Sequence, residues 1–171
     1  MFDTIAGLPI HPLVVHAVEV IVPLAALTLL LAAVWPRFRR WAYALPLLLA
    51  LGGLALVPIA TQSGQLLEER VGGSATLERH TQLGETLLPW VIGLAVLAAA
   101  LFWLEWQSRR SVAAGGGISA ARAALTRPAP RWVAIVLVVG ALVVSTGTIV
   151  QAIQIGHSGA TAVWGQTGAG S

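Results

Sequence analysis

The sequence predicts an all-α fold, an integral membrane four-helix bundle whose helices cross the bilayer up-down-up-down. The first observation is composition. Of 171 residues, 57% are hydrophobic and only 10% are charged, whereas soluble domains average about 25% charged residues; the mean hydropathy is +0.82. The second observation is that the apolar residues gather in four long segments, and a helix needs about 20 mostly apolar residues to cross a bilayer. We therefore expect a multi-pass membrane protein.

The four segments predict four helices in a single transmembrane domain that covers residues 1–171. Each segment is apolar on all sides, which is typical of a membrane span and not of an amphipathic surface helix. Helix-forming residues on both sides of Gly72-Gly73 predict a helical hairpin above the membrane, with Ser74 as an N-cap. The expected helices cover residues 12–35, 41–70, 74–107 and 131–156, and residues 108–130 form a flexible cytoplasmic linker.

The arginines predict the orientation of the bundle. Eight of the ten basic residues lie in two connections, one after the first helix and one between the third and the fourth. By the positive-inside rule these connections face the cytoplasm, so both termini are expected to be extracytoplasmic. The first connection, W-P-R-F-R-R, is expected to form a tight turn. The eight residues are Arg37, Arg39, Arg40, Arg109, Arg110, Arg122, Arg127 and Arg131.

Composition also excludes several functions. The basic residues are few and are all arginine, so a nucleic-acid-binding surface is not expected. The chain has no cysteine, which excludes disulfides, thiolate metal sites, iron–sulfur clusters and covalent c-type haem attachment. Any metal must therefore be held by histidine, carboxylate or amide groups.

All four histidines are expected at the extracytoplasmic face. His11 and His16 begin the first helix, His80 begins the third, and His157 follows Gly156, which is expected to end the fourth. Polar groups near the hydrocarbon usually face the bundle interior and mark a site. The histidines are therefore the candidate cofactor or metal ligands.

Helical geometry favours one pair of them. His11 and His16 are five residues apart, about 140° around a helix, so they cannot both point at one partner. The first and third helices of such a bundle are often diagonal, so His16, which lies a turn deeper, is expected to face His80 across the core. Two neutral imidazoles on opposite helices suit the axial positions of a b-type haem.

Other residues are expected to complete that haem site. Gly84, one turn beyond His80, leaves room for a porphyrin face, and Arg79 is available to the haem propionates. His11 and His157 are then supporting residues, or a second pair with room for another cofactor. The hypothesis is a di-His haem b protein that passes electrons near the outer face, for example from membrane quinol to an extracytoplasmic acceptor.

Two alternatives remain open. One is a copper, zinc or iron site formed by His11, His16, His80 and His157 with Glu19 or Glu85, since imidazole and carboxylate suit these ions. The other is a cofactor-free structural subunit of a larger membrane complex, whose histidines are solvated or cap helices. A stand-alone enzyme is less expected than an electron-transfer or binding subunit, because Ser158 lacks a nucleophile elbow and Ser158-Gly159 is typical of a turn.

Three stretches of the chain follow a family pattern. They are H-P-L-V-V-H in the first helix, His80 to Gly84 at the third, and G-H-S-G-A-T-A-V-W after the fourth. In these stretches, and over nearly its whole length, the chain resembles the DUF2231 family of prokaryotic membrane proteins. The matching positions are His11, Pro12, His16, His80, Gly84, Gly156, His157, Gly159, Val163 and Trp164.

The resemblance implies an association with redox proteins but no established activity. In this family the domain is also joined to Rieske-type or c-type cytochrome modules, which makes such proteins the expected partners, beside the lipid bilayer and quinone. The resemblance also implies a prokaryotic inner or plasma membrane.

Overall fold

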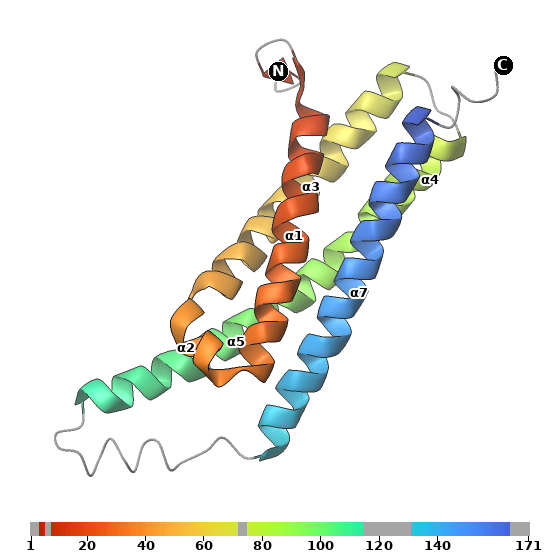
Figure 1. The fold of residues 1–171 in the computed structure, drawn as a ribbon. Helices are drawn as coiled ribbons and strands as arrows, with labels where there is room; N and C mark the ends of the chain where they lie inside the picture. The colour runs from red at the N-terminus through yellow and green to blue at the C-terminus, as the bar shows by residue number, and fades with distance from the viewer. Residues whose placement is uncertain (1–3, 6–7, 72–74, 115–130, 165–171) are drawn as a thin grey trace.

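The computed structural model describes residues 4–5, 8–71, 75–114 and 131–164. These residues are helical apart from a short N-terminal ladder and the short breaks between helices at Trp35, residues 43–44 and Thr86. In that ladder β1 (Thr4–Ile5) pairs antiparallel with β2 (Leu8–Pro9). Ser74 and residues 115–130 of the predicted linker lie outside the described residues. The helices are α1 (Ile10–Val34), α2 (Pro36–Ala42), α3 (Leu45–Val71), α4 (Ala75–Glu85), α5 (Leu87–Ala114) and α7 (Arg131–Trp164) (Figure 1).

Four helical stretches of the described chain are long and apolar enough to cross a membrane, which confirms the prediction of four spans. The third stretch combines α4 with α5, which are separated at Thr86. The start of α1, the end of α7 and the facing ends of α3 and α4 lie at one end of the bundle (Figure 1). The four stretches are Ile10–Val34, Leu45–Glu69, Leu77–Arg110 and Arg131–Thr161.

The first connection is a short helix, α2, rather than the expected tight turn. Pro36 stands in its first turn, where a fixed φ suits the helix and a missing N–H is no loss. The helix ends at Tyr43, whose φ is +43°. The guanidinium of Arg109 on α5 lies 4.1 Å from the centroid of the Tyr43 ring and donates to the carbonyl of Arg40. These contacts hold α2 against α5.

The last helix, α7, continues through Gly156 to Trp164, beyond the end that the sequence predicted. Gly156 serves close packing here, because a Cβ at this position would lie only 3.3 Å from Oε1 of Glu19 on α1. The Ser158-Gly159 pair, expected to form a turn, is therefore helical. This continuation places Ser158 and Gly159 beside α4.

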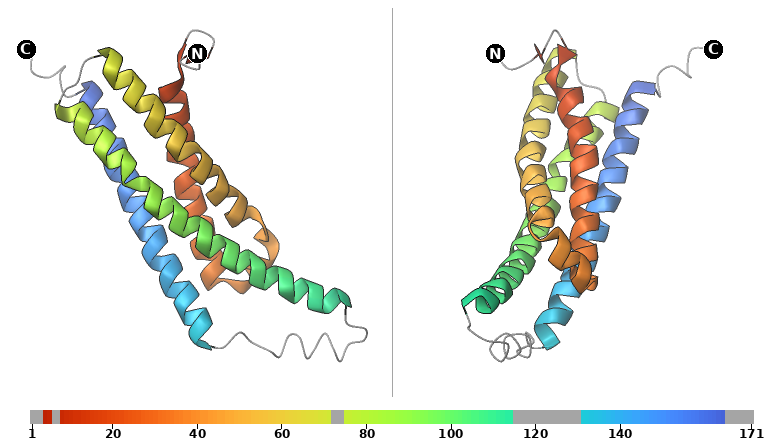
Figure 2. Two further views of the ribbon diagram at one scale, coloured as in Figure 1. Left: turned by 180° about the vertical axis from the view of Figure 1, so that it is seen from behind. Right: turned by 60° about the vertical axis from the view of Figure 1, so that its left-hand side comes forward.

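The helices surround two clusters of buried apolar side chains. Both α1 and α5 pack mainly against α3 and α7, so α1 and α5 are diagonal. Small residues such as Ala25, Ala26 and Ala98 dominate the central cluster, and they let the helices approach closely. The second cluster includes Val18, Val57 and Ile155 and lies nearer the start of α1. Figure 2 shows that α5 diverges from α7 toward the end that carries Ala114.

Buried polar groups are bonded within the bundle. The hydroxyl of Ser145 on α7 donates to the carbonyl of Ala26 on α1 over 2.9 Å. The amide of Gln151 on α7 donates to the Leu83 carbonyl over 3.2 Å, at the break between α4 and α5. In the described part of the chain, no buried side-chain nitrogen or oxygen lacks a partner. These bonds join α7 to two other helices, α1 and α4.

The packing of Trp90 on α5 against Gly147 on α7 gives a stability prediction. A Cβ at Gly147 would overlap the indole ring of Trp90, so Gly147→Ala should displace the ring and lower stability by about 1–3 kcal/mol, a typical cost of overpacking. In detergent, the Tm should fall by at least about 2 °C. Gly84→Ala is the matched control, since a Cβ at Gly84 meets no atom within 4 Å. An equal loss in both variants would contradict the packing role of Gly147.

Candidate functional site

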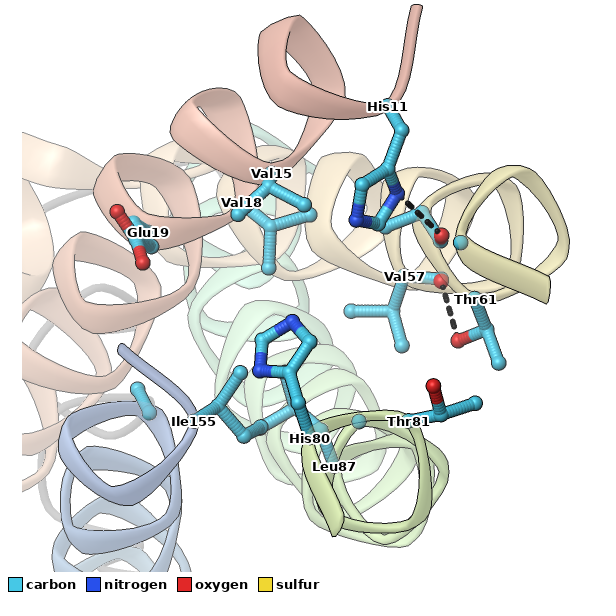
Figure 3. Close-up of a pocket in the computed structure, with 14 residues that line it drawn as sticks. His11, Val15, Val18, Glu19, Val57, Thr61, His80, Thr81, Leu87 and Ile155 are labelled. Atoms are coloured by element: carbon cyan, nitrogen blue, oxygen red, sulfur yellow. Dashed lines mark hydrogen bonds between the residues drawn. The ribbon is translucent and has the colours of Figure 1, made fainter. Parts of the chain in front are cut away.

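A hollow opens at the end of the bundle where α1 begins. It has a volume of about 610 Å³, counted with the open space at its mouth. Its walls are mainly apolar, and Val18, Val57 and Ile155 form part of them. Two imidazoles, those of His11 on α1 and His80 on α4, point into it from different sides (Figure 3). The hollow is therefore mainly apolar, with two imidazoles at its edges.

The hydrogen bonds of His11 determine which of its ring nitrogens is available. Its Nδ1 lies 3.1 Å from the carbonyl oxygen of Ala60 and 3.1 Å from Oγ of Ser63. The Ser63 hydroxyl donates its single proton to the Ala60 carbonyl over 3.0 Å, so its oxygen accepts from the imidazole. Nδ1 of His11 must therefore carry the hydrogen, and Nε2 keeps a free lone pair.

His80 reaches the same state through a different partner. Its Nδ1 lies 3.0 Å from Oγ of Ser158 on α7. The Ser158 hydroxyl donates to the carbonyl of Ile155 over 2.8 Å, so it too can only accept from the imidazole. Nδ1 of His80 is the donor, and Nε2 is again the free nitrogen.

Three glycines make room for the polar groups of the hollow. A Cβ at Gly64 on α3 would lie 2.9 Å from Cε1 of His11, and one at Gly159 on α7 would lie 3.1 Å from Cε1 of His80. A Cβ at Gly156 would likewise lie 3.3 Å from Oε1 of Glu19, which also lines the hollow. The sequence indicated Gly159 and Gly156 through G-H-S-G. Gly64 was missed, although T-Q-S-G carries both it and Ser63.

The structure brings together a different pair of histidines from the one expected. His16 is exposed, and its Nδ1 bonds to the carbonyl of Pro12 in its own helix over 2.6 Å. Because His11 and His16 are about 140° apart around α1, only one of them can face the hollow, and that one is His11. Gly84 lines the hollow with open space beside it.

The remaining candidates lie elsewhere. His157 and Arg79 line a second hollow, between α4 and α7, together with Ser158. His157 is therefore not paired with His11. Within the described ranges, no three histidine, aspartate or glutamate side chains are grouped so that they could hold a metal ion. Two imidazoles facing an apolar space are what the geometry provides.

The fold and its composition define a helical integral membrane protein. The chain belongs to the DUF2231 family of predicted membrane proteins, whose family model matches residues 7–169. This match confirms the resemblance found in the sequence. Comparison with curated proteins and with solved structures gave no match.

The hydrogen bonds of the two imidazoles predict an NMR result. In the protein without added cofactor, and above the pH range in which imidazole normally titrates, His11 and His80 should both be Nδ1–H tautomers. Ser158→Ala removes the acceptor of His80 and should shift that ring toward the Nε2–H form, while His11 keeps its bond to Ala60. Ring ¹⁵N chemical shifts report the tautomer, and His16→Gln helps to assign the signals. An Nε2–H tautomer of His80 in the unaltered protein would contradict the assigned bond.

Proposed function

We propose that this membrane protein binds a b-type haem between His11 and His80 and transfers electrons at that end of the bundle. The observation that carries the proposal is that two helices present Nε2 lone pairs to one mainly apolar hollow. Both Nδ1–H groups donate to partners on neighbouring helices, the support that metal-ligating histidines almost always have.

The composition of the hollow favours a porphyrin over a bare metal ion. A protein-held zinc or copper ion needs three or four side-chain ligands, and the described residues offer no such group. A haem brings four equatorial nitrogens and a broad apolar body of its own, so it needs only two imidazoles and an apolar space.

The ligand set indicates the type of chemistry. A haem held by His11 and His80 would supply one-electron transfer. The residues of this chain would hold and orient it: His11 and His80 as ligands, Ala60 and Ser158 as the acceptors that fix their rings. Gly84 leaves the open space beside them.

The orientation proposed for the bundle places this site outside the cytoplasm. Arg37, Arg40, Arg110 and Arg131 belong to α2, the end of α5 and the start of α7. These parts lie at the opposite end of the bundle from the start of α1 (Figure 1), and it is the start of α1 that carries His11 of the hollow. By the positive-inside rule the end with these arginines is cytoplasmic. The helices then cross up-down-up-down with both termini extracytoplasmic, in a prokaryotic cell membrane. Quinone in the bilayer and a Rieske or c-type cytochrome module outside it are the proposed redox partners.

An absorption spectrum of the purified protein tests the proposal. The reduced protein should show a Soret band and an α-band, and His11→Ala or His80→Ala should remove most of the bound haem, because each deletes one axial ligand. His16→Ala is the matched control. It removes an exposed histidine from the same helix and should leave the spectrum unchanged.

Two outcomes would contradict the proposal. A folded but colourless preparation, expressed with an adequate haem supply, would exclude haem. Loss of the spectrum in His16→Ala, with retention in His11→Ala, would exclude this ligand pair. Elemental analysis of the same samples distinguishes the metal reading, because copper, zinc or iron without porphyrin would favour a metal-ion site instead.

A further inference from the structure

A second hollow lies between α4 and α7 at the same end of the bundle. It encloses about 820 Å³, counted with the open space at its mouth. Arg79 on α4 and Gln154 and His157 on α7 supply its polar surface, and Leu83 supplies part of its apolar surface. All three polar side chains are exposed. Arginine and glutamine side chains present N–H donors and histidine always has at least one, so the hollow is rich in donors.

The charge of Arg79 is not compensated by any residue that the structure describes. Its guanidinium has no ion pair or side-chain hydrogen bond among the described residues, whereas Arg39 and Arg109 both lie beside Glu105 at the other end of the bundle. No carboxylate of a described residue lines the hollow. The two acids nearest along α4 accept from other side chains: Glu78 from Gln82 and Glu85 from Gln65.

The two hydroxyl groups that line the second hollow, those of Ser158 and Thr161, already donate hydrogen bonds to backbone carbonyls. Ser158 donates to the carbonyl of Ile155, and Thr161 donates to the carbonyl of His157 over 2.9 Å. The free donors are therefore Arg79, Gln154 and one imidazole nitrogen of His157. A positive charge with two neutral donors around an open space suits a phosphate group, since guanidinium binds phosphate through a fork of N–H groups.

The surface of α7 below the hollow indicates where such a phosphate comes from. Val150, Gln154 and His157 share one face at helical spacing, and Val150 is 48% exposed while the neighbouring Ile153 is 65% exposed. The hollow thus lies at the head of an apolar stripe on a membrane-spanning helix. That arrangement accommodates a charged headgroup above and acyl chains alongside.

We propose that Arg79, Gln154 and His157 bind the phosphate of an anionic phospholipid, whose chains lie along Val150 and Ile153. The site does not depend on haem. The described residues that line the two hollows do not overlap, and Ser158 of the second accepts a hydrogen bond from His80 of the first. The lipid would sit against the outer end of α4 and α7 and hold these helices together.

Lipid titration with thermal unfolding tests the proposal. Phosphatidylglycerol, added to the full chain in zwitterionic detergent, should raise the Tm more than the same amount of phosphatidylcholine, because a bound ligand stabilises the folded state. Arg79→Gln should weaken the apparent affinity for phosphatidylglycerol on the order of tenfold, as expected when one charged hydrogen-bonding group is lost. Arg79→Lys should retain part of the effect.

The matched control is Arg37→Gln, which removes an exposed arginine from α2 at the opposite end and should leave the affinity unchanged. Equal affinities in Arg79→Gln, Arg37→Gln and the unaltered protein would overturn the site. Inorganic phosphate is the third probe. If it raised the Tm as strongly as the lipid, in the same Arg79-dependent way, a soluble anion would replace the lipid and the lipid assignment would be overturned.

Discussion

The constraint on which this structure depends is that a polar group inside an apolar bundle must find its partner there. Within a bilayer, an unsatisfied polar group costs several kcal/mol. The chain meets this constraint with side chains that bond to a neighbouring helix: Ser145 to Ala26, Gln151 to Leu83, and His11 to Ala60. The same bonds that satisfy these groups also fix how the helices are rotated about their axes. In this fold, the hydrogen bonds that pair the buried polar groups therefore also determine how the helices pack.

Glycine solves the complementary steric problem. Gly147 accommodates the Trp90 ring between α5 and α7, whereas Gly64 and Gly159 accommodate the rings of His11 and His80. A Cβ at Gly64 or Gly159 would press against the imidazole beside it, and the ring would have to shift from its hydrogen-bond acceptor. The glycines thus act on the candidate site through ring position rather than through contact with a ligand.

The sequence predicted the four spans because hydropathy and length are sums over residues and need no knowledge of packing. The same reasoning could not give the end of α7: Gly156 is a common residue after a helix, yet here Glu19 of α1 lies against it and the helix continues. Similarly, the arginine-rich first connection has no helical spacing of apolar residues from which α2 could be predicted. Its helical form depends on Pro36 at the start and on contacts with Arg109 of α5.

The histidine site shows most clearly what a sequence leaves undetermined. The placement of the four histidines near one end of the bundle follows from where each helix begins or ends. Whether His11 or His16 faces the hollow depends instead on the rotation of α1 about its axis. The deeper position of His16 in the membrane favoured it in the sequence analysis. In the structure, the rotation of α1 turns His11 toward α3, where the Ala60 carbonyl accepts its hydrogen bond and Gly64 leaves space for its ring. His16 bonds instead to Pro12 of its own helix. One helix cannot present both rings to the hollow, so His16 needs a different explanation from His11. The histidine that faces the hollow is determined by the residues of α3 rather than by the spacing along α1.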